Sequence, residues 1–124
     1  MNLLKLIRSM FTAVPRVAAA DGMARVRAGE AVLVDVREPS EWSRGIAELA
    51  VPLALSDLAG RRTKWRPFLA ANADRELLLY CGAGVRSGMA ARVLVKEGFR
   101  ASNAGSLAEW TAAGWPVSRS TERR

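Results

Sequence analysis

The only cysteine of this 124-residue chain is the side chain best suited to covalent chemistry. Cys81 follows an apolar run at 77–80 and opens a stretch with glycines at positions 82, 84 and 88. Glycines let the backbone take positive φ angles and turn successive amides toward an anion. A helix that begins after this stretch adds the positive end of its dipole. The nearest anion is the thiolate of Cys81 itself, so the sequence predicts an activated thiol nucleophile.

The composition excludes the other usual ways of activating a thiol. The chain has no histidine, which removes Ser-His-Asp and Cys-His catalysis. A single cysteine removes an intrachain disulfide and every zinc site built from Cys and His. We therefore expect no metal and no cofactor, and we expect backbone dipoles and arginine to activate Cys81. The chemistry requires this thiol to be ionised and open to solvent.

Alternating strands and helices are predicted to position the cysteine. The aliphatic runs at 31–36 and 77–80 are typical of strands buried on both faces of a parallel sheet. Shorter strands are expected at 50–53, where Pro52 favours a sheet edge, and at 99–103. Helices are predicted at 23–29, at 40–44, from 56 to about 73, at 89–97 and at 105–110. This order indicates right-handed crossovers and one parallel sheet with helices on both faces.

Charged residues follow the first long strand of this arrangement. Ligands in such folds bind beyond the carboxyl ends of the strands, so Asp35 to Glu38 and the Cys81 turn should face one crevice. Asp35 and Arg37 are predicted to form a structural hydrogen-bonded pair that braces the loop. Glu38 is predicted to line the mouth of the crevice.

The residues after the cysteine form the predicted substrate loop, which consists of Gly82, Ala83, Gly84, Val85, Arg86 and Ser87. Arg86 is expected to contact a substrate anion. Ser87 is expected to start the next helix and to hydrogen-bond the sulfur. The four tryptophans are expected to pack in the core or at its rim.

The net charge of +7 favours small anions and is also compatible with nucleic acid or acidic lipid. The basic run at 61–66 is interpreted as a solvated helix face, so we expect no nucleic-acid partner.

Residues 1–16 form an amphipathic extension that is too short and too charged to span a membrane. We expect a cytoplasmic monomer or homodimer. Export or attachment to a membrane surface through residues 1–20 is the alternative.

Several motifs, taken in order, resemble the single-domain rhodanese-like proteins. They are the segment 34–39, Glu41-Trp42, Gly45, the loop 81–87, the segment 103–106, Trp110 and the segment 113–117. The resemblance covers a domain at 17–117, followed by a polar tail at 118–124. It implies an α/β rhodanese-like fold, a central parallel sheet of about five strands flanked by helices on both faces.

The resemblance also implies a reaction. Sulfurtransferases of this family move a sulfane sulfur from thiosulfate or a similar donor to a thiol or cyanide through a cysteine persulfide, here on Cys81. Thiosulfate-using members often carry Arg or Lys directly after the cysteine, whereas this chain has Gly82. The alternative is therefore a sulfur-relay or persulfide carrier module, which receives sulfur from a protein partner and turns over little thiosulfate. A sulfur-carrier protein is a possible acceptor.

The spacing from Cys81 to Arg86 disfavours phosphatase chemistry. Cysteine phosphatases and arsenate reductases of related architecture use a Cys-x5-Arg loop, which is wide enough for a tetrahedral oxyanion. The spacing here is Cys-x4-Arg. The tighter ring suits a single transferred sulfur better than a phosphate with three equatorial oxygens.

Overall fold

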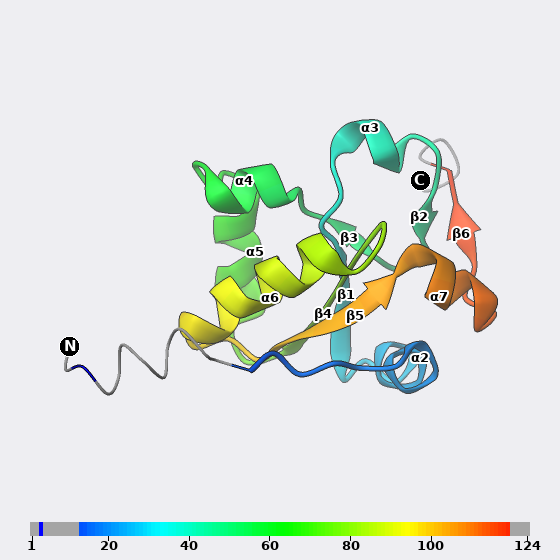
Figure 1. The fold of residues 1–124 in the computed structure, drawn as a ribbon, viewed down its shortest axis with the longest axis horizontal. Coiled ribbons are helices and arrows are strands. Elements are labelled where there is room, and N and C mark those ends of the chain that lie inside the picture. The colour runs from blue at the N-terminus through cyan, green and yellow to red at the C-terminus, as the bar shows by residue number, and fades with distance from the viewer. Residues whose placement is uncertain (1–2, 4–12, 120–124) are drawn as a thin grey trace.

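A four-stranded parallel sheet forms the centre of the computed structural model, which describes residue 3 and residues 13–119 (Figure 1). The strands are β1 (Ala31–Asp35), β3 (Val51–Pro52), β4 (Glu76–Cys81) and β5 (Ala101–Ser106). Their order in the sheet is β3-β1-β4-β5, with β3 at an edge as Pro52 predicted. The described sheet thus has four strands rather than about five, and an isolated parallel bridge joins Arg16 to Asn103 of β5.

Helices cover both faces of the sheet, as predicted (Figure 1). The helices α4 (Leu55–Ala59), α5 (Trp65–Ala71) and α6 (Val85–Lys96) pack on one face. The helices α2 (Ala19–Arg27) and α7 (Leu107–Ala112) pack on the other. The short helix α3 (Pro39–Trp42) follows β1 and lies beyond the carboxyl ends of the strands.

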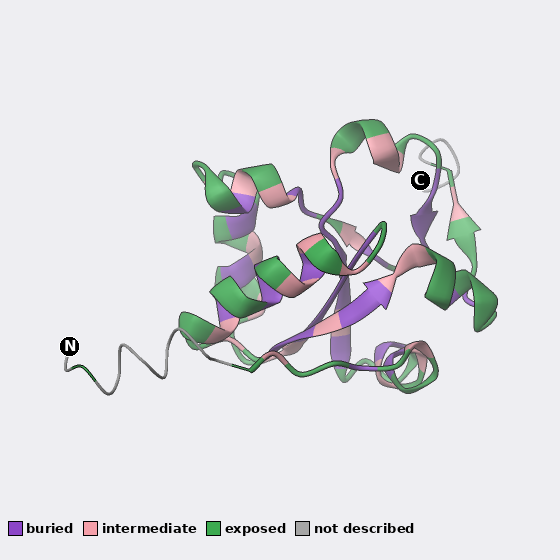
Figure 2. Ribbon diagram, in the orientation of Figure 1, coloured by how far each residue is buried: buried purple, intermediate pink, exposed green. Residues whose placement is uncertain are grey.

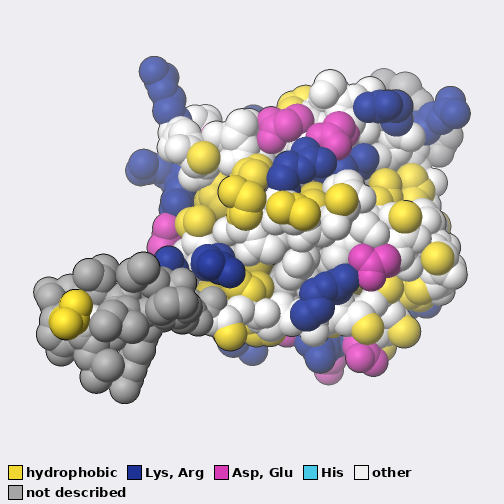
Figure 3. All heavy atoms as spheres, viewed as in Figure 1, with side chains coloured by type: hydrophobic (Ala, Val, Ile, Leu, Met, Phe, Trp, Pro, Cys, Tyr) yellow, Lys and Arg dark blue, Asp and Glu magenta, His cyan; other side chains and the backbone are white. Residues whose placement is uncertain are grey.

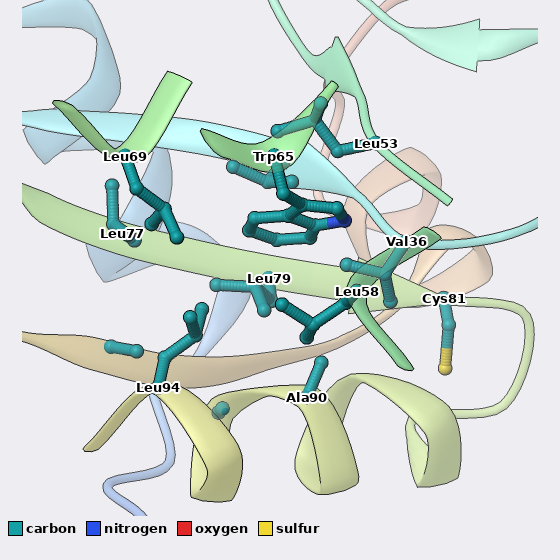
Figure 4. Packing of buried hydrophobic residues seen from close by; sticks show 13 residues of the cluster. Val36, Leu53, Leu58, Trp65, Leu69, Leu77, Leu79, Cys81, Ala90 and Leu94 are labelled. Carbon is teal, nitrogen blue, oxygen red and sulfur yellow. The ribbon is translucent and has the colours of Figure 1, made fainter. Parts of the chain in front are cut away.

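Alternation along β4 divides the core into two layers. Leu77 and Leu79 pack toward α4, α5 and α6, whereas Leu78 and Tyr80 pack toward α2 and α7. All four are fully buried, as expected for a central strand covered on both faces (Figure 2). Cys81 ends this strand, and its sulfur points toward the first turn of α6 (Figure 4).

Three tryptophans are buried in these layers. Trp65 packs in the first, and Trp110 and Trp115 meet edge to face in the second with their ring centroids 5.4 Å apart. Trp42 lies partly exposed beyond the sheet. These positions agree with the predicted packing roles.

The prediction of one helix from 56 to about 73 is wrong, because α4 and α5 are separate. The chain leaves α4 at Gly60, and the carboxylate of Asp57 accepts hydrogen bonds from the amides of residues 63, 64 and 65. A side chain that accepts these amides replaces the carbonyl partners of a continuous helix.

Other boundaries also differ from the prediction. α2 begins at Ala19 rather than residue 23, and α6 begins at Val85 rather than residue 89. A two-stranded antiparallel sheet of β2 (Ile46–Ala47) and β6 (Val117–Ser118) was not predicted. The predicted amphipathic extension lies mostly outside the described residues, as does the tail beyond residue 119. Among the helices that are described, none has the length and apolar character needed to cross a membrane.

Candidate active site

The loop between β4 and α6 encloses the sulfur of Cys81. Residues 82–84 make the turn, and Gly84 adopts a left-handed conformation with φ of 87° as the N-cap of α6. A Cβ at Gly84 would also lie 3.6 Å from Cα of Gly105 in β5, so the turn approaches the neighbouring strand closely. The 3.6 Å separation would be an ordinary van der Waals contact, so it is the left-handed φ that favours glycine at this position.

Backbone amides of the loop donate hydrogen bonds to the cysteine. The amide of Gly84 lies 3.0 Å from Sγ, and the amide of Ser87 lies 3.3 Å from it. The hydroxyl of Ser87 is also 3.3 Å from Sγ. Burial alone would raise the pKa of Cys81, but the hydrogen bonds from Ser87 and from the amides of residues 83 and 84 outweigh it and lower the pKa. The arrangement therefore favours the thiolate.

Cys81 is only 1% exposed, although the chemistry requires access to its thiol. The amides of Gly84 and Ser87 and the hydroxyl of Ser87 surround Sγ, and these groups are called the cysteine cup below. Burial is the observation that counts most against the predicted nucleophile, while the amide hydrogen bonds favour it.

Asn103 holds the loop from β5, a role that the sequence analysis missed. Its side-chain amide donates to the carbonyl of Gly84 over 3.0 Å. Its side-chain oxygen accepts from the hydroxyl of Ser87 over 2.8 Å and from the amide of Gly105 over 2.9 Å. Asn103 belongs to one of the motifs behind the family resemblance, which was the only signal in the sequence.

Arg86, for which a contact with a substrate anion is predicted, is paired with a neighbouring carboxylate. Its guanidinium forms a two-pronged ion pair with Glu41 of α3, with N–O distances of 2.6 and 2.9 Å. The pair lies over Gly82, since a Cβ built there would be 3.1 Å from Nη2 of Arg86. The hydrogen bond from Arg86 lowers the pKa of Glu41 to about 2, and the same bond raises the pKa of Arg86.

Asp35 and Arg37 form a buried pair, with the guanidinium donating two hydrogen bonds to one carboxylate oxygen at 3.1 and 2.9 Å. Arg37 also donates to the carbonyl of Gly45 over 2.6 Å. The hydroxyl of Tyr80 donates to Asp35 over 2.6 Å and accepts from the amide of Ala47. The pair thus braces the loop at 45–47 rather than the cysteine loop.

Glu38 lies at the junction of α3 and α4. Its carboxylate accepts hydrogen bonds from the amide and the hydroxyl of Ser56, at 3.2 and 2.6 Å. It also contributes to the electrostatic environment of Arg86, whose pKa it helps to raise. The structure therefore brings Glu38, Glu41 and Arg86 together beside the cysteine loop.

A family profile described as Rhodanese-like domain matches residues 18–113. This chain belongs to the rhodanese-like family. A sulfurtransferase from Allochromatium vinosum is 29% identical over 90 residues, which cover 71% of this chain and 78% of that protein. The protein YqhL of Bacillus subtilis is 42% identical over 74 residues, which cover 58% of this chain and 54% of YqhL. The chain thus matches about half of the length of YqhL.

Solved structures agree with the assigned fold. A rhodanese-related protein from Thermoplasma volcanium superposes with a TM-score of 0.70 at 27% identity, over 84% of this chain and 97% of that one. A thiosulfate sulfurtransferase from Pseudomonas aeruginosa superposes with a TM-score of 0.71 at 22% identity, over 96% of this chain and 22% of that one. At that level of identity the second comparison shows a common fold alone.

Proposed function

We propose that this rhodanese-like protein is a sulfurtransferase that works through a persulfide on Cys81. The observation that carries the proposal is the pair of amides, from Gly84 and Ser87, that donate to Sγ. Donors fixed by the backbone stabilise a thiolate without a histidine base, which this chain lacks. The rhodanese-like profile and the Allochromatium vinosum relative support the same class of reaction.

The proposed reaction has two displacement steps. The thiolate of Cys81 attacks the sulfane sulfur of the donor, a new S–S bond forms, and the donor's own bond to that sulfur breaks. The leaving group keeps the electron pair, as sulfite from thiosulfate or as a thiolate from an organic persulfide. An acceptor thiolate or cyanide then attacks the outer sulfur of the Cys81 persulfide, and the Cys81 thiolate leaves. No external oxidant or reductant is needed.

The same amides suit the intermediate. The outer sulfur of a persulfide is also anionic, and it would remain beside the positive N-terminal end of α6. A phosphoryl group would need donors for three equatorial oxygens. The guanidinium that phosphatases use for this purpose corresponds to Arg86, which is already paired with Glu41. The geometry therefore favours sulfur transfer over phosphoryl transfer.

Replacement of Cys81 by serine tests the proposed function. We expect the wild-type protein to gain one sulfur on Cys81 when incubated with thiosulfate or an organic persulfide, and to pass it to cyanide. Cys81→Ser should show neither reaction, because an alcohol does not ionise at neutral pH. Intact-mass spectrometry detects the persulfide, and thiocyanate formation measures its transfer. Absence of sulfur on the wild-type protein with both donors would refute the proposal.

A sulfur-relay module is the second candidate, and the absence of a cation at Gly82 favours it. Such a module would form the Cys81 persulfide but turn over thiosulfate and cyanide slowly. A persulfide that survives added cyanide, but is lost to a protein thiol, would support the relay. Rapid thiocyanate production would support the enzyme.

A further inference from the structure

Three charged side chains beside the cysteine cup, those of Arg86, Glu41 and Glu38, define its mouth, and together they carry more negative than positive charge. Arg86 supplies one positive charge, and Glu41 and Glu38 supply two negative ones that act on it. Arg37, which follows β1, does not alter this balance, because its side chain is buried in an ion pair with Asp35. Figure 3 shows acidic and basic side chains meeting where α3 faces the start of α6. The local balance is thus opposite to the net charge of +7 for the whole chain.

This balance matters for the choice of sulfur donor. Thiosulfate is a dianion whose sulfonate oxygens need a cation at the mouth while its sulfane sulfur enters the cup. The guanidinium of Arg86 has its hydrogen-bonding edge occupied by Glu41 at 2.6 and 2.9 Å. Gly82 offers no side chain in its place. A like-charged group near the mouth repels a dianion more than a monoanion.

We propose that the Glu41–Arg86 pair makes organic persulfides, rather than thiosulfate, the preferred sulfur donors of Cys81. Glu41 acts as a specificity residue because it withdraws Arg86 from the donor. The inference rests on the sulfurtransferase function proposed above. An organic persulfide with a neutral organic group carries one negative charge, on the terminal sulfur that Cys81 takes. The amides of Gly84 and Ser87 donate to Sγ of Cys81, the atom to which that sulfur becomes bonded.

A groove beside the mouth offers contacts that only an organic donor can use. It has a volume of about 750 Å³, and Pro39, Trp42, Pro52 and Ala54 form its apolar part. Glu38 lines this groove, and its backbone amide donates to the Glu41 carboxylate that pairs with Arg86, so the groove adjoins the mouth. An organic group bound in the groove would gain contacts with these apolar side chains, which thiosulfate, an anion without carbon, cannot make.

The balance of the reaction is the same for both donors. The thiolate of Cys81 takes the terminal sulfur of the organic persulfide, forming one S–S bond as another breaks. The organic thiolate leaves with the electron pair and takes a proton from solvent. The donor groups differ in charge and size, so a comparison of loading rates isolates what the mouth recognises.

Single-turnover loading of Cys81, followed by intact-mass spectrometry, tests the proposal without an acceptor. The probes are thiosulfate and the persulfide of N-acetylcysteine methyl ester, at equal concentration. We expect the wild-type protein to load faster from the organic persulfide. In Glu41→Gln the freed Arg86 should raise the thiosulfate rate by about tenfold and leave the persulfide rate within about twofold, as expected for one charge-assisted contact.

The matched control is Glu97→Gln. It removes a second two-pronged ion pair, to Arg62 at 2.7 and 2.9 Å, near the end of α6 far from the cup, and should leave the ratio of the two rates unchanged. Gly82→Lys is a second variant that adds a cation without removing Glu41. Gly82 is not in the left-handed region, and its nearest neighbour is the end of the flexible Arg86 side chain. This variant should also raise the thiosulfate rate.

The outcomes separate the assignment of the donor from the proposed sulfurtransferase function. Faster wild-type loading from thiosulfate, or an unchanged ratio of rates in both Glu41→Gln and Gly82→Lys, overturns the donor assignment and leaves sulfur transfer intact. If neither donor loads the wild-type protein, the proposed function itself fails, and the donor assignment fails with it.

Discussion

At Cys81 two opposing effects act on one thiol. Burial disfavours the charged form, and hydrogen bonds from the loop favour it by more, so the pKa is lowered. The hydroxyl of Ser87 has a single proton and three acceptors within reach, which are Sγ at 3.3 Å, the side-chain oxygen of Asn103 at 2.8 Å and the carbonyl of Gly105 at 3.5 Å. A thiolate is a stronger acceptor than a thiol, so ionisation of Cys81 draws that proton toward the sulfur.

Ser87→Ala should therefore make the thiol less reactive. Loss of the hydroxyl removes a hydrogen bond that lowers the pKa of Cys81, so less thiolate is present at pH 7. We expect the rate of alkylation by iodoacetamide to fall by roughly tenfold at that pH and to recover in alkaline solution. Ser43→Ala, which removes an exposed hydroxyl bonded to the Ser40 carbonyl, is the control. An unchanged pH profile would show that the hydroxyl stays on Asn103.

The residue types of the site and the local pair of Asp35 and Arg37 could be predicted, but the pairings between distant elements could not. Cys81 and its glycines were recognised because they lie next to one another in the chain. The pairing of Arg86 with Glu41 could not be foreseen, because Glu41 lies on another element, 45 positions away. Asn103 escaped notice for the same reason, since it acts from β5 on a loop that follows β4. Sequence distance hides contacts that only the sheet brings together.

At the scale of elements, one buried network joins three segments. Asp35 at the end of β1 receives hydrogen bonds from Arg37 and from Tyr80 of β4. Arg37 and Tyr80 in turn bind the backbone of Gly45 and Ala47. Burial and the neighbouring Asp35 raise the pKa of Tyr80, so its hydroxyl stays a donor over the physiological range. The network fixes the segment that enters β2.

Tyr80→Phe should destabilise the fold by about 2 kcal/mol, because it removes the hydrogen bond to the buried carboxylate of Asp35 and the one from the amide of Ala47. Asp35→Ala should cost about 3–5 kcal/mol, because it leaves the buried guanidinium of Arg37 without its counter-charge. Urea denaturation followed by fluorescence measures both. The test is whether Asp35→Ala lowers the free energy of unfolding by more than Tyr80→Phe does. A smaller loss for Asp35→Ala than for Tyr80→Phe would mean that Arg37 finds another partner.

The elements with strong local signals were predicted well. The aliphatic runs became β1 and β4, since buried central strands need continuous apolar sequence. The helix expected from residue 56 to about 73 failed, because the carboxylate of Asp57 captures three amides and turns the chain. The sheet of β2 and β6 has strands of only two residues. Such strands carry no periodicity that a sequence could reveal.

For the whole molecule, the dependence of stability on pH is set by the side chains that gain or lose a proton in each pH range. The chain has 12 Asp and Glu and no histidine, so side chains of ordinary pKa do not titrate between the carboxylates and the thiol. Several carboxylates are paired in the fold. Hydrogen bonds from Arg62 lower the pKa of Glu97, and hydrogen bonds from the Ser106 amide and hydroxyl and from Arg16 lower that of Glu109.

We therefore expect the free energy of unfolding to be flat from about pH 5.5 to 7 and to change on either side. A carboxylate whose pKa is lowered by folding stabilises the fold at pH values above its pKa in the unfolded chain. This contribution disappears as the pH falls through its pKa in the folded protein. For Glu41 the fall runs from 4.5 to about 2. The lowered pKa of Cys81 acts at the other end, because the unfolded thiol binds a proton that the folded thiolate has lost.

Stability should consequently rise with pH above neutrality until the unfolded thiol also ionises, near pH 8.5. Urea denaturation at a series of pH values measures the whole curve. Cys81→Ser should remove the alkaline rise and keep the acid fall, whereas Glu41→Gln should reduce the acid fall and keep the rise. A decrease in wild-type stability between pH 7 and 8.5, absent in Cys81→Ser, would mean that the fold holds this thiol in its neutral form. In that case the amides of the loop do not overcome burial, and the sulfur has no charge with which to attack a donor.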